Sequence, residues 1–177
     1  INLSCPHAKG YGAEIGRDAK KSRNIVETVK ESVNIPVFAK LSIMCDIVKV
    51  AKEIERGGAD AVVAINTVGP ACKIEIDVGK PVLGNKIGGL SGKAIKPLGI
   101  GCVYLLYKVL EIPIIGVGGI SCGEDVIEYM MAGATAVQIG SAVVNGMSIF
   151  RKIEREMREY IGKRGLDIKD IVGMAHE

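Results

Sequence analysis

The sequence predicts an α/β fold in which helices pack outside a parallel β-sheet. An internal repeat carries this prediction: 35–40 and 112–117 are apolar runs led by a proline, and 58–64 and 133–139 both start with Gly-Ala before a second apolar run. An amphipathic segment separates the two runs in each copy. Short apolar runs alternating with helices are typical of βαβ units, whose strands are buried and parallel.

Composition indicates one well-cored domain over residues 1–177. The chain is 48% hydrophobic, with 23 Gly and no Trp. Its net charge is +3, and the 23 basic and 20 acidic residues are mixed along the chain without a basic block, which disfavours nucleic-acid binding. No apolar run approaches the roughly 20 residues of a membrane span.

Five strands are predicted, near Asn2 and over 36–40, 61–65, 113–117 and 135–139. Five strand–helix units correspond to the C-terminal five-eighths of a (β/α)₈ barrel, which takes about 250 residues when complete. The sequence starts on a motif typical of a strand end. We therefore expect a single partial barrel domain without about the first three strands.

The predicted helices have recognisable starts and stops. One carries apolar residues over 47–54 and stops at Gly57-Gly58, and another covers 94–110. The expected N-terminal caps are small polar or acidic residues: Asp18, Asp46, Ser121 in a capping box with Glu124, and Ser148.

The stretch 68–89 is too long for an ordinary connection between a strand and a helix. Its segments 73–77 and 80–83 predict a small hairpin, or an excursion over the site.

Cys5 is the first candidate for chemistry. A strand cannot continue through Pro6, so the thiol is expected at a strand end or in the following loop, where parallel α/β folds keep their active sites. There it could act as a general base or as a nucleophile. The alternative is a buried cysteine that serves as a small hydrophobic residue.

The cysteines argue against cross-links and clusters. There are five, an odd number, and no Cys-x-x-Cys pair exists. This disfavours a disulfide framework and a zinc or iron–sulfur site in this chain. Reduced thiols indicate a cytoplasmic protein.

Polar residues follow two more of the predicted strands. Lys40 ends one strand, where it either faces an anionic ligand or extends along the barrel rim to reach water. Asn66 and Thr67 follow the next, where they can hydrogen-bond a planar polar ring or simply make a turn.

Glycines cluster at 88–92, 116–119 and 140, each at a predicted strand or helix end. Glycine lets backbone N–H groups approach an anion, and the loops after strands 7 and 8 of complete barrels commonly hold phosphate. If the last two strands are 7 and 8, Gly118, Gly119, Gly140 and Ser141 form a phosphate site.

With these motifs, the chain resembles the FMN-dependent dihydroorotate dehydrogenases of class 1 and, more distantly, the pyrimidine-reducing domain of dihydropyrimidine dehydrogenase. The matching segments occur in family order and span nearly the whole chain. They are 2–6, 38–41, 65–68, 88–92 with 95–97, 116–120, and 138–141.

The resemblance implies FMN as cofactor and dihydroorotate oxidation to orotate in pyrimidine (UMP) biosynthesis. Cys5 would take a proton from C5 as hydride leaves C6 for flavin N5. Substrate would be bound by Asn2, Asn66 and Thr67. FMN would be bound by Asn2, Lys40, Ile65, Gly92, Gly118, Gly119, Gly140 and Ser141, with Lys40 stabilising the reduced flavin.

Some positions depart from the family pattern. His7 replaces a common Asn and is familiar from dihydropyrimidine dehydrogenases, so uracil-type chemistry stays open beside orotate chemistry; His7 could also be a plain loop residue. Lys93 replaces a common Pro after Gly92. A non-catalytic phosphate-binding barrel fragment is the third alternative.

The resemblance also implies partners. The stretch 112–116 favours the NAD-linked type, in which a separate iron–sulfur/FAD subunit passes electrons to NAD; fumarate or another acceptor stays open. A homodimer is expected, without nucleic acid or a membrane span.

Overall fold

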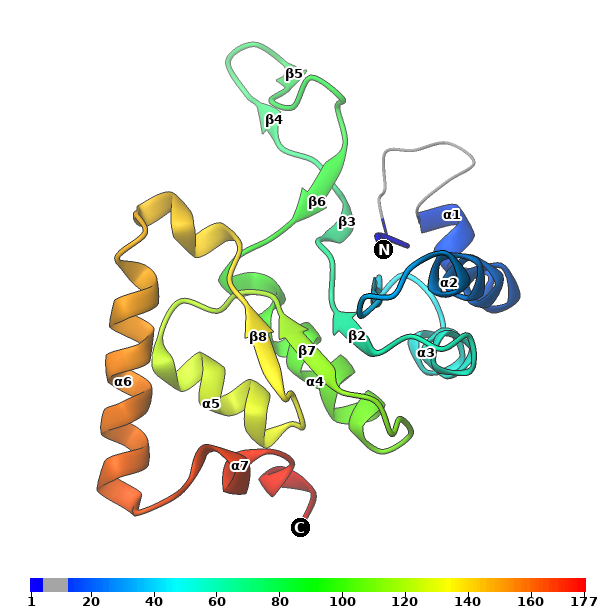
Figure 1. The fold of residues 1–177 in the computed structure, drawn as a ribbon. Coiled ribbons are helices and arrows are strands. Elements are labelled where there is room, and N and C mark those ends of the chain that lie inside the picture. Colours follow the sequence, from blue (N-terminus) through cyan, green and yellow to red (C-terminus); the bar gives the residue numbers. More distant parts are fainter. Residues whose placement is uncertain (5–12) are drawn as a thin grey trace.

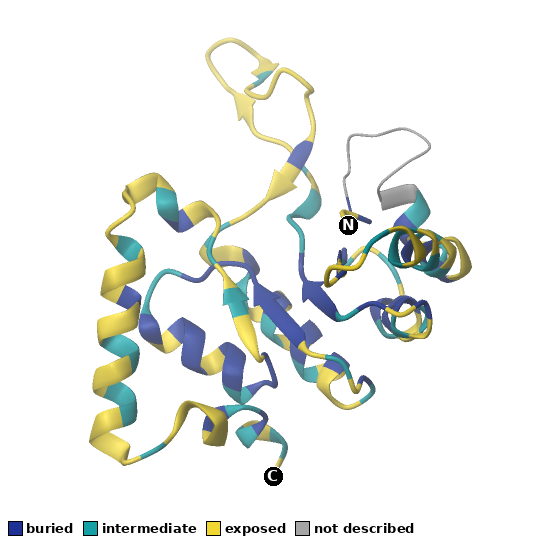
Figure 2. Ribbon diagram, in the orientation of Figure 1, coloured by how far each residue is buried: buried dark blue, intermediate teal, exposed yellow. Residues whose placement is uncertain are grey.

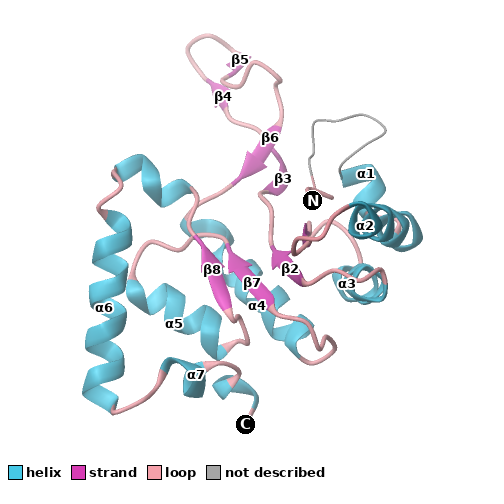
Figure 3. Ribbon diagram, in the orientation of Figure 1, coloured by secondary structure: helices cyan, strands magenta, loops and turns pink. Residues whose placement is uncertain are grey.

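The computed structural model describes residues 1–4 and 13–177, and its centre is a four-stranded parallel sheet (Figure 1, Figure 3). The strands lie in the order β1-β2-β7-β8. Their bounds are Phe38–Lys40 for β1, Ala61–Ala64 for β2, Ile114–Val117 for β7 and Ala136–Gln138 for β8. The predicted α/β class with a parallel sheet is confirmed.

The predicted strand near Asn2 is wrong as a strand. Asn2 forms only an isolated parallel bridge with Lys40. Two backbone hydrogen bonds make this bridge, from Leu3 N to Lys40 O at 3.2 Å and from Lys40 N to Ile1 O at 2.9 Å. The bridge nevertheless ties the segment before Cys5 to the sheet edge.

Helices precede and follow the strands as the repeat predicts. The α-helices are α1 Ala13–Gly16, α2 Ala19–Ser32, α3 Ile47–Arg56, α4 Lys96–Tyr107, α5 Gly123–Met131, α6 Ile149–Arg164 and α7 Ile168–Ile171; 3-10 turns are η1 Lys93–Ile95, η2 Ser141–Asn145 and η3 Met174–His176. In this described part of the chain, no helix has both the length and the apolar character needed to cross a membrane.

Two predicted caps are confirmed. The carboxylate of Asp18 accepts hydrogen bonds from the backbone N–H groups of Lys20 and Lys21, and that of Asp46 from the N–H of Lys49. These bonds satisfy donors that a helix start leaves without partners.

Three details of the predicted helices need correction. The capping box of α5 joins Cys122 and Asp125, one residue later than predicted, because a carboxylate at the third helical position can reach back to the cap. Ser148 stands at the cap of α6, but its side chain makes no capping hydrogen bond. The helix predicted over 94–110 is shorter, since a 3-10 turn forms its start and it stops at Tyr107.

Side chains alternate between the two faces of the sheet. Ala39, Val62 and Ile114 belong to the main core, which includes apolar residues of α2 to α6. On the opposite face Val63 and Val117 belong to a second, smaller buried cluster. Figure 2 shows burial concentrated on the central strands and the helices next to them.

The excursion after β2 forms an arm that projects from the sheet (Figure 1). Strands β3 (Val68–Ala71) and β6 (Gly88–Leu90) pair antiparallel at its base, and β4 (Ile74–Glu75) pairs with β5 (Lys80–Pro81) at its tip. The predicted hairpin is therefore confirmed. Most of the arm is exposed, including the aliphatic side chain of Ile76 at 88% (Figure 2).

Candidate functional site

The carboxyl ends of the parallel strands meet at one edge of the sheet and carry most of the predicted site residues. Lys40 is the last residue of β1, and Asn66 follows β2 by two residues. Gly118 follows β7 directly, and Gly140 follows β8 by two residues. Ligands of parallel sheets bind at this edge, so the fold groups these residues as the sequence predicts.

A hydrogen-bond network joins Asn2 to Asn66 through Ser4, which is 3% exposed. The Ser4 hydroxyl donates to Asn2 Oδ1 at 2.7 Å, and Ser4 N donates to the same oxygen at 3.0 Å. Asn66 Nδ2 donates to Ser4 O at 2.9 Å and to Ser4 Oγ at 2.8 Å. The network fixes the chain immediately before Cys5 against the end of β2.

Asn66 also orders the residue that follows it. Its Oδ1 accepts a hydrogen bond from Thr67 N at 2.8 Å. Thr67 in turn lies against Gly89 at the base of the arm, where a Cβ on Gly89 would come within 2.6 Å of Thr67 Cβ. The arm is thereby attached directly beside the polar network.

Ile65 and Lys40 differ in what they offer to a ligand. The Ile65 side chain is 1% exposed and packs in the main core, so only its backbone can face a ligand at the sheet edge. Lys40 is half-buried, and within the described residues its ammonium forms no hydrogen bond or ion pair. Its charge is therefore available at the edge.

The glycine clusters are in contact with one another. A Cβ on Gly92 would lie 3.7 Å from Ser141 Oγ, and a Cβ on Gly119 would lie 2.8 Å from Gly92 O. Both glycines have positive φ, +82° and +71° respectively, which L side chains rarely adopt. Three loops from distant parts of the sequence thus converge beyond β7 and β8.

These loops present backbone donors. Among the described residues, no acceptor contacts the N–H groups of Gly119, Gly140 or Ser141. Gly119 is itself buried, and a buried N–H without a partner is costly. Unpartnered N–H groups on converging glycine loops suit an oxyanion such as a phosphate.

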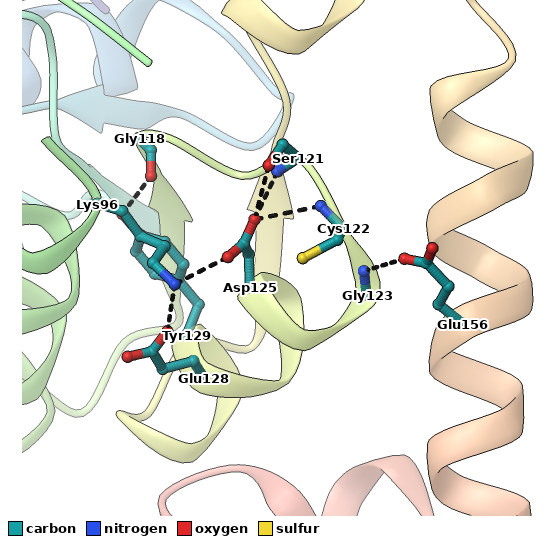
Figure 4. A network of polar contacts seen from close by, with 9 residues as sticks. All are labelled: Lys96, Gly118, Ser121, Cys122, Gly123, Asp125, Glu128, Tyr129 and Glu156. Carbon is teal, nitrogen blue, oxygen red and sulfur yellow. Dashed lines mark hydrogen bonds and ion pairs between the residues drawn. The ribbon is translucent and has the colours of Figure 1, made fainter. Parts of the chain in front are cut away.

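A carboxylate network holds the loop between β7 and α5 (Figure 4). Asp125 accepts hydrogen bonds from Ser121 N at 2.8 Å and Cys122 N at 3.2 Å, and Glu156 of α6 accepts one from Gly123 N at 2.7 Å. The N–H groups of Ser121 and Cys122, just before α5, and of Gly123, its first residue, are therefore already occupied by side chains of the protein. An anion at this edge has to use the glycine loops instead.

Lys96 of α4 forms ion pairs with Asp125 of this network and with Glu128. Its ammonium lies 2.8 Å from Asp125 Oδ1 and 2.7 Å from Glu128 Oε2. These hydrogen bonds raise the pKa of Lys96. Burial raises the pKa of Asp125, but the hydrogen bonds from Lys96, Ser121 and Cys122 outweigh it and lower that pKa to about 2.

Tyr129 supports the same loop from inside the core. It is fully buried, and its hydroxyl donates a hydrogen bond of 2.9 Å to Gly118 O (Figure 4). Burial raises the pKa of this hydroxyl, which keeps it protonated and donating. Gly99 and Gly116 make room for its ring, since a Cβ on either would lie within 2.5 Å of a Tyr129 atom.

Sequence reasoning missed Asp125, Tyr129 and Glu156 as supports of the site. An acid three residues after the cap of α5 was a usable signal for Asp125. No local pattern indicates Tyr129 or Glu156, because they act across the packed helices.

Two predicted residues, Cys5 and His7, lie outside the described residues. Within residues 1–4 and 13–177, no group of three or more His, Cys, Asp or Glu side chains is placed to hold a metal ion.

Comparison with known proteins shows the family to which the chain belongs. The sequence model of the family described as dihydroorotate dehydrogenase matches residues 1–161. The chain is 53% identical to a protein of Methanocaldococcus jannaschii over all of this chain and 58% of that protein. It is 51% identical to a protein of Methanosarcina acetivorans over all of this chain and 57% of that protein. It is 50% identical to a protein of Archaeoglobus fulgidus over 99% of this chain and 58% of that protein.

Each of these three relatives is named dihydroorotate dehydrogenase B (NAD(+)), catalytic subunit. The chain spans a little under three-fifths of their length. The family match covers most of the chain, and the identity is about half over its whole length. The chain therefore belongs to the dihydroorotate dehydrogenase family.

Proposed function

We propose that the protein takes part in the flavin-dependent oxidation of dihydroorotate to orotate in pyrimidine (UMP) biosynthesis. The observation that carries this proposal is the common sheet edge, which brings the Asn2–Ser4–Asn66 network and the glycine loops together. A polar network suits a small planar substrate, and the loops suit a phosphate-bearing cofactor. Family membership supports the reaction class.

FMN is the proposed cofactor, and when bound it supplies the hydride acceptor. Its phosphate would be held by backbone N–H groups of Gly92, Gly118, Gly119, Gly140 and Ser141. The buried N–H of Gly119, which meets no acceptor among the described residues, supports this fit. Lys40 would place a positive charge beside the flavin ring, and Ile65 would contact it through its backbone.

Substrate would bind beside the polar network. Cys5 follows Ser4 in the sequence, and we assign it as the base that removes the C5 proton. Asn2 and Thr67 would hydrogen-bond the substrate directly. Asn66 would do so through the remaining lone pair of its Oδ1, because its two Nδ2 donors already hold Ser4 and the other lone pair accepts from Thr67 N.

The proposal includes the setting of the site. Residues 1–177 would form a single domain, the C-terminal five-eighths of a (β/α)₈ barrel, in a cytoplasmic protein. A homodimer and a separate iron–sulfur/FAD subunit would complete the enzyme. The word "subunit" in the relatives' names and the exposed aliphatic residues of the arm support association with other chains.

The deciding experiment is flavin reduction followed by visible absorbance. The FMN-loaded protein is mixed anaerobically with dihydroorotate or with dihydrouracil, and we expect bleaching with dihydroorotate only. Cys5→Ala should slow the bleaching at least about 100-fold while FMN stays bound, because general-base catalysis contributes about 10²–10⁴-fold. Cys45→Ala is the matched control, and its flavin should bleach normally.

Bleaching by dihydrouracil alone would assign uracil-type chemistry instead. No bleaching with either substrate would favour a non-catalytic phosphate-binding protein.

A further inference from the structure

A pocket of about 390 Å³ lies where α5, η2 and the start of α6 approach the glycine loops. Its lining includes two ammonium groups, Lys93 and Lys152, and three neutral hydrogen-bonding side chains, Ser121, Asn145 and Ser148. None of the described residues that line it carries a carboxylate. The lining therefore favours an anion.

Two residues that line the pocket, Lys93 and Ser121, are close neighbours of the loop glycines. Lys93 follows Gly92 directly, and its Cα would lie 3.2 Å from a Cβ placed on Gly119. Ser121 stands two residues after Gly119. An anion bound by the loop N–H groups would therefore have the Lys93 side chain as a close neighbour.

Lys93 is the ammonium that the protein leaves available here. Lys96, three residues later, is occupied by Asp125 and Glu128. Lys152 lies 3.7 Å from Glu156. Within the described residues Lys93 forms no ion pair, and its side chain is exposed.

The start of α5 cannot supply the missing charge complement. Its first N–H group, that of Gly123, donates to Glu156, and the N–H groups of Ser121 and Cys122 just before the helix donate to Asp125, which places two carboxylates at this end of the loop. A phosphate monoester carries nearly two negative charges at neutral pH. The backbone donors alone would leave that charge without a cationic partner.

We propose that Lys93 is a specificity residue that selects a flavin carrying a phosphate monoester over the same flavin without phosphate. The inference rests on the proposed function, because it takes FMN as the cofactor. Lys93 acts as a point charge beside the glycine loops, and the loops supply directional hydrogen bonds.

The test compares dissociation constants of FMN and riboflavin, measured by quenching of flavin fluorescence. Lys93→Gln should raise the constant for FMN about tenfold, since charge-assisted hydrogen bonds are worth at least that much in binding. It should leave riboflavin binding unchanged and weaken the dependence of FMN binding on salt. Lys93→Arg should retain most of the FMN affinity.

Lys52→Gln is the matched control, because Lys52 is exposed on α3 and its loss changes the net charge equally. It should leave both constants unchanged. Equal weakening of FMN and riboflavin by Lys93→Gln, or no weakening of either, overturns the role of Lys93. If FMN still supports dihydroorotate oxidation in that case, the proposed function stands; if the unaltered protein binds no FMN, both fail.

Discussion

The ammonium of Lys96 lies 2.8 Å from Asp125 Oδ1 and joins α4 to the start of α5. The other oxygen of Asp125 accepts hydrogen bonds from the loop that follows β7. One carboxylate therefore connects a helix on the outside of the sheet to a loop of the candidate cofactor site. The shape of that loop depends on a charge that is 7% exposed.

Asp125→Asn should destabilise the protein by about 2 kcal/mol at neutral pH. The pKa of Asp125 is lowered from 3.8 to about 2, and that difference corresponds to about 2 kcal/mol in favour of the folded state. The contribution is fully present above about pH 4 and is lost as the pH falls toward 2, because the unfolded chain then binds the proton first. Urea unfolding of the unaltered protein and of Asp125→Asn at pH 7 and pH 3 measures this contribution. The difference in unfolding free energy between the two proteins should shrink by roughly half at pH 3.

Glu124→Gln is the control for this experiment. Glu124 is the exposed neighbour of Asp125. In the capping box predicted from the sequence, Glu124 and not Asp125 would be the acid that stabilises the start of α5. Its substitution should change the free energy of unfolding by less than about 0.5 kcal/mol. A larger loss with Glu124→Gln than with Asp125→Asn would contradict the assignment.

Tyr129→Phe should cost about 1–3 kcal/mol of unfolding free energy, because it leaves the buried carbonyl of Gly118 without its donor. The ring stays, so packing against Gly99 and Gly116 is retained. Tyr160→Phe on α6 is the matched control, since the Tyr160 hydroxyl makes no hydrogen bond within the described residues. Chemical denaturation measures the free energy of unfolding of both variants. Equal stability of the two would rule out a supporting role for the Tyr129 hydroxyl.

Gly119→Ala should weaken FMN binding by at least about tenfold and lower stability. Its φ of +71° disfavours alanine, and the added Cβ would lie 2.8 Å from Gly92 O and from Lys96 Cβ. Gly101→Ala in α4 is the contrasting variant, since its Cβ would meet nothing within 4 Å and alanine favours a helix by about 1 kcal/mol. FMN titration and thermal unfolding should show weaker FMN binding and lower stability for Gly119→Ala than for Gly101→Ala. Similar affinity and stability of the two variants would argue against a tight Gly92–Gly119 contact.

Much of the fold could be predicted from local patterns. Pro-led apolar runs located β1 and β7, and Asp18 and Asp46 marked helix starts because their carboxylates bond to nearby N–H groups. The strand expected near Asn2 did not form. Strand pairing depends on a neighbouring backbone that residue type does not specify, and here it amounts to one bridge to Lys40.

The candidate site was predictable where it depends on position at a strand end. Parallel strands bring their carboxyl ends together, so Lys40, Asn66 and Gly118 could be grouped in advance. The supports were not predictable in this way. Tyr129 and Asp125 lie on helix α5, and their effect on the loop comes from tertiary contacts that have no fixed sequence spacing.

Asn66→Ala should slow the reduction of bound flavin by dihydroorotate about 100-fold while changing FMN affinity less than about twofold. The substitution removes the hydrogen bond from Thr67 N and the two to Ser4 O and Ser4 Oγ; loss of the latter two releases the chain just before Cys5, and misplacement by about 1 Å can cost that much in rate. Asn85→Ala on the exposed arm is the control. Stopped-flow absorbance gives the rate and fluorescence titration gives the affinity. Loss of FMN binding together with the rate would mean that Asn66 supports the cofactor site and not the position of Cys5.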